Sequence, residues 1–112
     1  MDAVMQSERA LGHHPVDVSH ENRGYDIESR SGKDDSLRFL EVKARHPSAE
    51  TIFLTRNELI CALNNPDQWT LVYVPVDQGK AATPIYSQGT FKDDIPFEAS
   101  NFKIRIENLS KK

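Results

Sequence analysis

The chain lacks the features of secreted and membrane proteins. It contains one cysteine, Cys61, so no internal disulfide can form. No apolar run is long enough to cross a bilayer, and the first residues show no signal-peptide pattern. Internal repeats and low-complexity tracts are also absent. We therefore expect a cytoplasmic protein without a membrane partner.

An excess of basic charge is also missing. The chain has 14 Lys and Arg against 17 Asp and Glu, which gives a formal net charge of −3. Tight nucleic-acid binding needs a basic face that neutralises phosphates, so an isolated chain of this composition would bind nucleic acid only weakly. The 112 residues suffice for one core, and we expect a single domain over residues 1–112 that was excised from or appended to a larger protein.

The clearest local pattern is a β-hairpin. Residues 24–30 and 37–45 alternate apolar and polar side chains, and residues 31–35 between them are turn formers. With the apolar residues on one core face, paired residue numbers must have an odd sum. That register places Tyr25 and Ile27 on the core side. It places Asp26 beside Glu41 and Lys43 on the other face, the last two being roughly 6.5 to 7 Å apart along the strand.

Two carboxylates and one ammonium on a shared face suit a hard divalent cation. Mg²⁺ binds through carboxylate oxygens, waters and substrate phosphate, and Mn²⁺ takes similar ligands. A lysine beside the metal can orient the attacking water and offset the charge of the transition state. The alternative is a solvated strand face with cross-strand ion pairs, which is common on hairpins.

Further elements follow from local signals. We expect helices at residues 2–12 and 55–63, the second begun by a capping box of Thr55 and Glu58. Strands are predicted at residues 16–18, 52–54, 69–76, 84–86 and 102–106. Residues 92–101 read as a loop and residues 110–112 as a frayed tail.

Four ordered blocks of sequence, at residues 8–12, 22–27, 38–45 and 54–58, resemble the NO VEIN C-terminal domain family. The resemblance covers about residues 1–90. That family is similar to the PD-(D/E)XK nuclease superfamily, which has a restriction-endonuclease-like α/β (α+β) fold. The resemblance therefore implies a single domain with a mixed central sheet and the core order helix, strand, strand, strand, helix, strand.

The resemblance also implies roles for matching residues. Asp26 and Glu41 correspond to the metal-binding acids, Lys43 to the catalytic lysine, and Glu8 to an outer acid on the first helix. The aspartate follows Gly-Tyr here instead of Pro, which reduces the superfamily signature to Asp and Glu-x-Lys. Such domains resemble accessory parts of helicases and ATPases, so a helicase or ATPase domain is an expected partner.

Residues near the predicted site have two interpretations. Arg45 is a candidate phosphate contact, as are Arg56 and Asn57 at a helix start, where N–H groups attract phosphate. Simple surface exposure explains Arg56 and Asn57 equally well. Glu58 could reach the site, but reciprocal capping with Thr55 explains it without chemistry.

Two functions of different classes remain open at this point. The first is a Mg²⁺- or Mn²⁺-dependent nuclease that cuts DNA, with Asp26, Glu41 and Lys43 as its catalytic residues. The second is a catalytically inactive nuclease-like module that docks nucleic acid or another protein domain. The intact charged cluster favours the first function, and the acidic composition favours the second.

Overall fold

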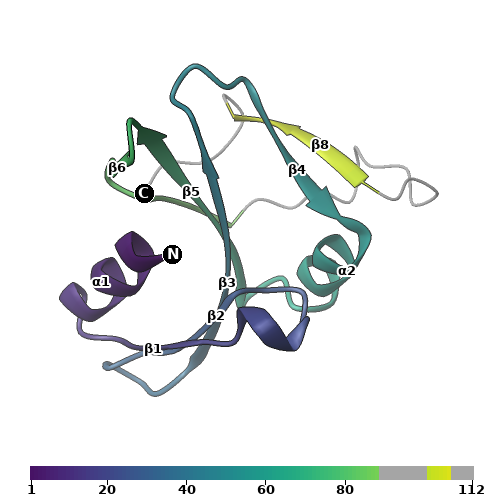
Figure 1. Cartoon of the computed structure of the whole chain (residues 1–112). Coiled ribbons are helices and arrows are strands. Elements are labelled where there is room, and N and C mark those ends of the chain that lie inside the picture. Colours follow the sequence, from purple (N-terminus) through teal and green to yellow (C-terminus); the bar gives the residue numbers. More distant parts are fainter. Residues whose placement is uncertain (89–100, 107–112) are drawn as a thin grey trace.

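The fold is a mixed α/β arrangement, seen in a computed structural model that describes residues 1–88 and 101–106 (Figure 1). The elements follow in the order α1 (Asp2–Ala10), β1 (His14–Asp17), the 3₁₀ helix η1 (Ser19–Glu21), β2 (Ile27–Arg30), β3 (Leu37–Arg45), β4 (Thr51–Thr55), α2 (Arg56–Asn64), β5 (Trp69–Asp77), β6 (Lys80–Ala81), β7 (Ile85–Ser87) and β8 (Asn101–Arg105). Each α-helix is nine residues long, and no helix in the described residues is long and apolar enough to cross a membrane.

A curled mixed sheet forms the centre of the molecule. Its strands lie in the order β1, β2, β3, β5 and β6, with β7 also pairing with β5. All neighbours are antiparallel except β3 and β5, which run parallel with Phe39 opposite Trp69 and Arg45 opposite Pro75. Parallel neighbours need a long connection, and here β4 and α2 supply it.

The strand β4 leaves the central sheet and pairs with β8. These two strands form a separate antiparallel sheet in which Ile52 lies opposite Ile104. Four strands therefore lie between α1 and α2, whereas the resemblance implied three, and only β1, β2 and β3 of these belong to the central sheet.

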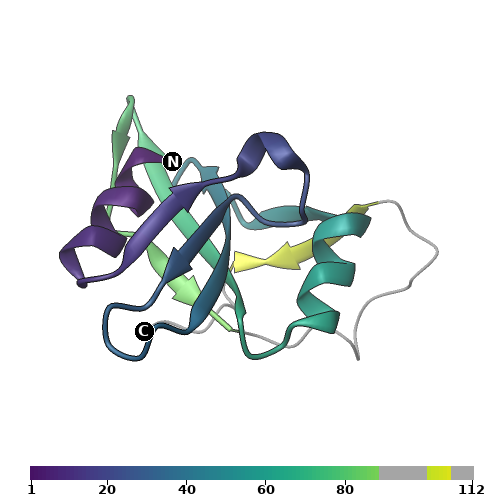
Figure 2. The same ribbon diagram turned by 90° about the horizontal axis from the view of Figure 1, so that it is seen from below.

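Both faces of the central sheet are covered, as Figures 1 and 2 show with α1 and α2 on opposite sides of β3 and β5. The core beneath α1 contains Val4, Ile27, Leu40, Val72 and Val74. The core on the face of α2 and the small sheet contains Ile52, Leu54, Leu59, Trp69, Leu71, Tyr73 and Ile104. The side chains of β3 and β5 point alternately into these two cores. Both faces of the sheet are therefore covered where these two strands pair.

The sequence located most of these elements. The first helix ends at Ala10, two residues before the predicted end, and the predicted strands correspond to β1 to β5, β7 and β8. The predicted tail at residues 110–112 lies outside the described residues, as does the predicted loop at 92–101 except for Asn101 in β8.

Tyr25 is a core residue, as predicted, but the prediction that it shares a core face with Ile27 was wrong. Its ring stacks on Phe39, with centroids 4.4 Å apart, and it belongs to the core that faces α2. Ile27 belongs to the opposite core, and β2 begins only at that residue. Tyr25 follows Gly24, whose φ is +90°, so it precedes the regular alternation on which the prediction relied.

Candidate active site

Asp26 lies beside β3 just before β2 begins, and it lines the same pocket as Glu41. Ile27 pairs with Leu40, so the register has the odd sum that the alternation predicted. The Asp26 N–H donates to the Leu40 carbonyl over 2.8 Å, and Asp26 Oδ2 accepts from the Val42 N–H over 2.9 Å. These two bonds hold the Asp26 carboxylate against the backbone of β3, next to Glu41.

Lys43 follows Glu41 by two residues and therefore shares its face of β3. Its Nζ lies 3.4 Å from Glu41 Oε2 and 2.9 Å from Glu58 Oε1. The ammonium thus lies between a strand carboxyl and a helix carboxyl. Asp26, Glu41 and Lys43 are brought together, on the face that α2 covers.

Glu58 has both of the roles considered for it. The Thr55 hydroxyl accepts from the Glu58 N–H over 3.2 Å, and Glu58 Oε1 accepts from the Thr55 N–H over 2.9 Å, which completes the predicted capping box. The same oxygen accepts from Lys43. The capping box fixes the side chain toward β3, so Glu58 joins the site, and its place in the first turn of a helix that follows the strands was the available signal.

Burial controls the charge of Glu41, which is only 3 % exposed. Burial first, and then the charges of Asp26 and Glu58, raise the pKa of Glu41 to about 10, while Lys43 acts in the opposite direction. Without a cation, Glu41 therefore carries a proton at pH 7.

The surroundings of Lys43 keep it charged. Burial lowers the pKa of Lys43, but hydrogen bonds and charges from Glu58 and Glu41 outweigh burial and raise its pKa overall. Lys43 is therefore an ammonium at neutral pH, able to donate hydrogen bonds but not to accept a proton.

A pocket of about 160 Å³ opens onto these carboxyl groups. Its lining comes from the β1–β2 connection, β3 and the start of α2, and consists of Ser19, Asn22, Gly24, Tyr25, Asp26, Glu41, Thr55, Asn57 and Glu58. Since water occupies about 30 Å³ in the liquid, this volume admits a hydrated ion or a phosphate oxygen with a few waters.

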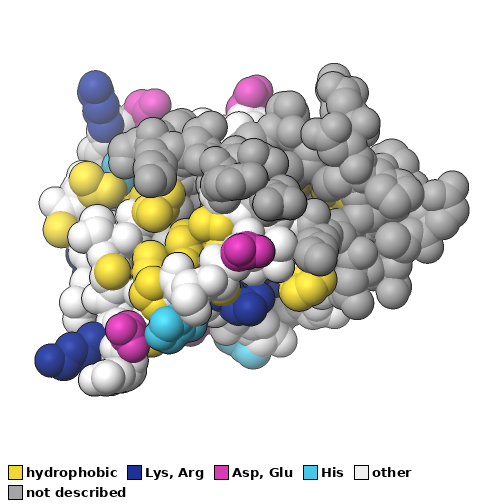
Figure 3. Space-filling model, turned by 90° about the horizontal axis from the view of Figure 1, so that it is seen from above, with side chains coloured by type: hydrophobic (Ala, Val, Ile, Leu, Met, Phe, Trp, Pro, Cys, Tyr) yellow, Lys and Arg dark blue, Asp and Glu magenta, His cyan; other side chains and the backbone are white. Residues whose placement is uncertain are grey.

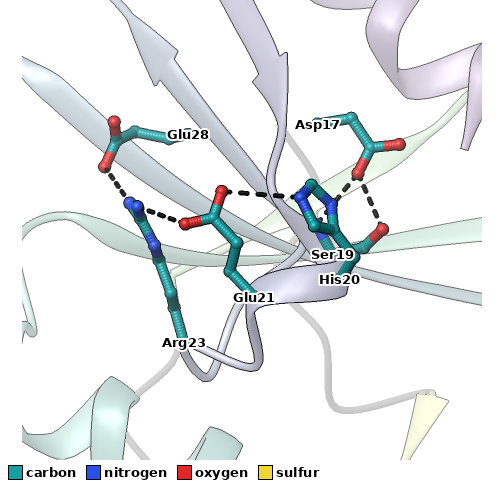
Figure 4. Close-up of polar contacts among 6 residues, drawn as sticks. All are labelled: Asp17, Ser19, His20, Glu21, Arg23 and Glu28. Atoms are coloured by element: carbon teal, nitrogen blue, oxygen red, sulfur yellow. Dashed lines mark hydrogen bonds and ion pairs between the residues drawn. The ribbon is translucent and has the colours of Figure 1, made fainter.

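Polar contacts fix the wall formed by the β1–β2 connection (Figure 4). Arg23 bonds to Glu21 and to Glu28, and the Asp17 carboxylate accepts from the N–H and hydroxyl of Ser19. The start of η1 is thereby bonded to the end of β1, and Arg23 links the end of η1 to β2.

The same wall packs directly against α2. Asn57 Nδ2 donates to the Asn22 carbonyl over 3.3 Å. Gly24 approaches α2 so closely that a Cβ atom there would lie 2.7 Å from Cys61 Cβ. Glycine at position 24 therefore lets the wall close against the helix, and its φ of +90° also favours glycine.

The remaining predicted residues are not gathered at the pocket, apart from Asn57. Glu8 is fully buried on the α1 side of the sheet, bonded to Arg38 and Tyr86. Arg45 is exposed at the end of β3 and donates to the Thr51 carbonyl. Arg56 is exposed at the start of α2 and does not line the pocket. Helix α1 packs on the face opposite α2, and this arrangement separates Glu8 from Asp26.

The donor set for a cation is small. Within the described residues, no group of three or more His, Cys, Asp or Glu side chains is arranged to hold a metal ion. Asp26 and Glu41 offer hard carboxylate oxygens, and Mg²⁺ commonly uses one or two carboxylates with waters and substrate phosphate for the rest. The residues present fit such a cation, provided that Glu41 loses its proton.

The molecular surface carries charges of both signs (Figure 3). On the face in Figure 3, the described Lys and Arg side chains are scattered among Asp, Glu and His, without a broad basic patch in the part of that face that is described. This distribution agrees with the net charge of −3.

Fold and site together define a small α/β domain with an acidic pocket and an embedded lysine. The family model described as Protein NO VEIN, C-terminal, matches residues 1–87. The chain therefore belongs to the NO VEIN C-terminal family. No curated protein and no solved structure matches it.

Proposed function

We propose that this domain is a metal-dependent nuclease of the PD-(D/E)XK type that hydrolyses phosphodiesters, with DNA as the first candidate substrate. The observation that carries the proposal is that Asp26 and Glu41 line one pocket and that Lys43 Nζ lies 3.4 Å from Glu41 Oε2. The position of β4 outside the central sheet, which leaves the order α1, β1, β2, β3, α2, β5 for the helices and the sheet strands up to β5, is a second feature in favour of the proposal.

Asp26 and Glu41 would hold Mg²⁺ or Mn²⁺ in this proposal. The cation would supply Lewis-acid polarisation of the phosphate and a lowered pKa for a bound water. Asp26 is already fixed by the Val42 N–H, so it offers an oriented carboxylate. Glu41 carries the proton that must be lost on loading, which couples metal affinity to pH.

Lys43 would stabilise charge in the transition state. Because its pKa is raised, it acts as an ammonium that donates to the attacking water or to a phosphate oxygen, and not as a base. Glu58 holds the ammonium from the other side over 2.9 Å and limits its motion. Glu58 is therefore a positioning residue in this scheme.

The test is a cleavage assay with high enzyme, low salt and Mn²⁺, on single-stranded, duplex and branched DNA and on RNA. We expect metal-dependent cutting that falls steeply with salt, because phosphate contacts are salt-sensitive and the domain is acidic. Lys43→Ala should reduce turnover by about 10²-fold or more while metal binding persists.

Lys33→Ala is the matched control for this assay. Lys33 is exposed in the β2–β3 turn, outside the pocket lining, so this variant should cut like the wild type. If wild type and Lys43→Ala are equally inactive on every substrate under these conditions, the nuclease proposal fails for the isolated domain.

The second candidate is an inactive nuclease-like module that docks nucleic acid or a helicase or ATPase domain. The observation that favours it is the internal neutralisation of the site, where Lys43 contacts two carboxyl groups and Glu41 is protonated. In such a site, Lys43 balances part of the carboxylate charge without a metal. Absence of Mn²⁺ binding together with retained nucleic-acid binding would support this module.

A further inference from the structure

A second pocket lies on the α1 side of the central sheet. Its volume is about 490 Å³, within the range of about 300–1,000 Å³ that is usual for ligand pockets. Its lining includes Ser7, Leu11, Arg38, Thr70, Thr83 and Tyr86. None of these residues lines the acidic pocket, so the two sites are separate.

The guanidinium of Arg38 is held in place at the wall of this pocket. Fully buried Glu8 accepts a hydrogen bond from Arg38 Nη1 and another from the Tyr86 hydroxyl over 2.8 Å. The guanidinium carbon also lies 5.8 Å from the centre of the Tyr86 ring. Because these contacts fix Arg38 without any ligand, little rotamer entropy remains to be lost on binding.

The donors of Arg38 suit a ligand with two adjacent acceptors. Arg38 donates to Glu8 through Nη1. The other edge of the guanidinium, formed by Nε and Nη2, takes no part in that bond. One quarter of the Arg38 side chain is exposed, and it lines the pocket. A planar ligand that offers two neighbouring acceptors would match this edge in the way that carboxylates and guanine do.

The charge of the pocket distinguishes between those two ligand classes. Among the described residues of the lining, only Arg38 is charged, and the Glu8 carboxylate bonded to it balances its charge. A phosphate or carboxylate would therefore add uncompensated negative charge close to Glu8. Hydroxyl groups from Ser7, Thr70 and Thr83 supply neutral donors and acceptors, and Leu11 supplies an apolar surface. The lining favours a neutral heterocycle.

We propose that this pocket binds a nucleobase, with guanine as the preferred one. Guanine presents O6 and N7 side by side, which is the pair of acceptors that arginine bonds in a bidentate manner. The ring of Tyr86 and the side chain of Leu11 provide apolar surface for the heterocycle, and Thr70, 3 % exposed, provides a hydroxyl. This inference does not depend on nuclease activity at Asp26 and Glu41.

The test is to titrate the whole chain with guanosine, adenosine, uridine and a short single strand that contains one guanine. Binding is measured by NMR amide shifts and by calorimetry. We expect guanosine to bind with a Kd of about 1 mM or tighter and to shift Thr70 and Tyr86. Adenosine and uridine should bind at least about tenfold more weakly, since one bidentate pair contributes that much discrimination. Binding by the single strand alone would mean that the base is read within a nucleic acid.

Arg38→Lys is the main variant because it keeps a cation beside Glu8 and removes the planar guanidinium with its two adjacent N–H donors. It should weaken guanosine binding by about tenfold or more. Arg30→Lys is the matched control, since Arg30 is exposed on β2 and pairs with Asp35 outside the pocket. If Arg38→Lys does not fold, Leu11→Glu at a 60 % exposed position and Thr70→Val test the same pocket.

Three results would overturn the proposal. The first is that neither the nucleosides nor the single strand binds. The second is that guanosine shifts the amide signals of Asp26 and Glu41 and leaves that of Thr70 unchanged. The third is that the pocket variants bind guanosine as tightly as the wild type does. A loss of binding in the pocket variants, with Arg30→Lys unchanged, would support it.

Discussion

Replacing the protonated carboxyl group of Glu41 with an amide should stabilise this protein at neutral pH. Glu41 is 3 % exposed, and its pKa is raised from 4.5 to about 10 by burial first and then by Asp26 and Glu58. At pH 7 the folded state keeps a proton that the unfolded state has lost. Holding that proton from pH 4.5 up to pH 7 costs about 3 kcal/mol of stability. Glu41→Gln has nearly the same shape and needs no proton, so its free energy of unfolding should exceed that of the wild type by up to about 3 kcal/mol.

The sign of the effect fixes its pH dependence. Because the folded pKa lies above the unfolded one, the wild type is relatively most stable below about pH 4.5 and loses stability as the pH rises toward 10. The gap between Glu41→Gln and wild type should therefore be small at pH 4.5 and should widen through pH 7 and 8.5.

Urea unfolding at these three pH values measures the gap. Glu50→Gln, at an exposed position, serves as the control and should change stability by less than about 0.5 kcal/mol. A Glu41→Gln protein less stable than wild type at pH 7, or a gap that does not change with pH, would show that Glu41 is ionised and structurally required.

Other substitutions separate structural from chemical roles. Asp26→Asn keeps an acceptor for the Val42 N–H and should change the free energy of unfolding by less than about 1 kcal/mol. Asp26→Ala leaves that N–H without its acceptor and should lower the free energy of unfolding, measured with urea, by about 1–3 kcal/mol. Equal losses for both would contradict this assignment. Arg38→Met leaves the Glu8 carboxylate buried and unpaired and should cost about 3–5 kcal/mol; a melt within 2 °C of wild type would refute a structural ion pair.

Local patterns predicted the hairpin and its register because two alternating segments with one turn between them allow few pairings. The odd-sum register places Asp26 opposite Glu41 without any knowledge of the tertiary structure. The capping box at Thr55 and Glu58 was equally local. Such features depend on residues that are close in sequence or paired by a short turn.

Features that depend on packing between distant elements could not be predicted in the same way. The alternation in β3 does not reveal that both faces are buried, because a second core requires knowing that α1 and α2 lie on opposite sides. Glu8 was assigned to the site by resemblance, yet its helix lies on the other face, where Arg38 neutralises it. Glu58 reaches Lys43 only because α2 packs against β3.

We expect Asp26 and Glu41 to bind a divalent cation at the pocket that both of them line, next to Lys43. Calorimetric titration of Mn²⁺ into the wild type, Asp26→Asn and the Glu50→Gln control tests it most directly. We expect one site with a Kd in the range of about 1 µM to 1 mM for wild type and control, and no binding by Asp26→Asn. Equal binding by Asp26→Asn, or no binding by the wild type, would contradict it.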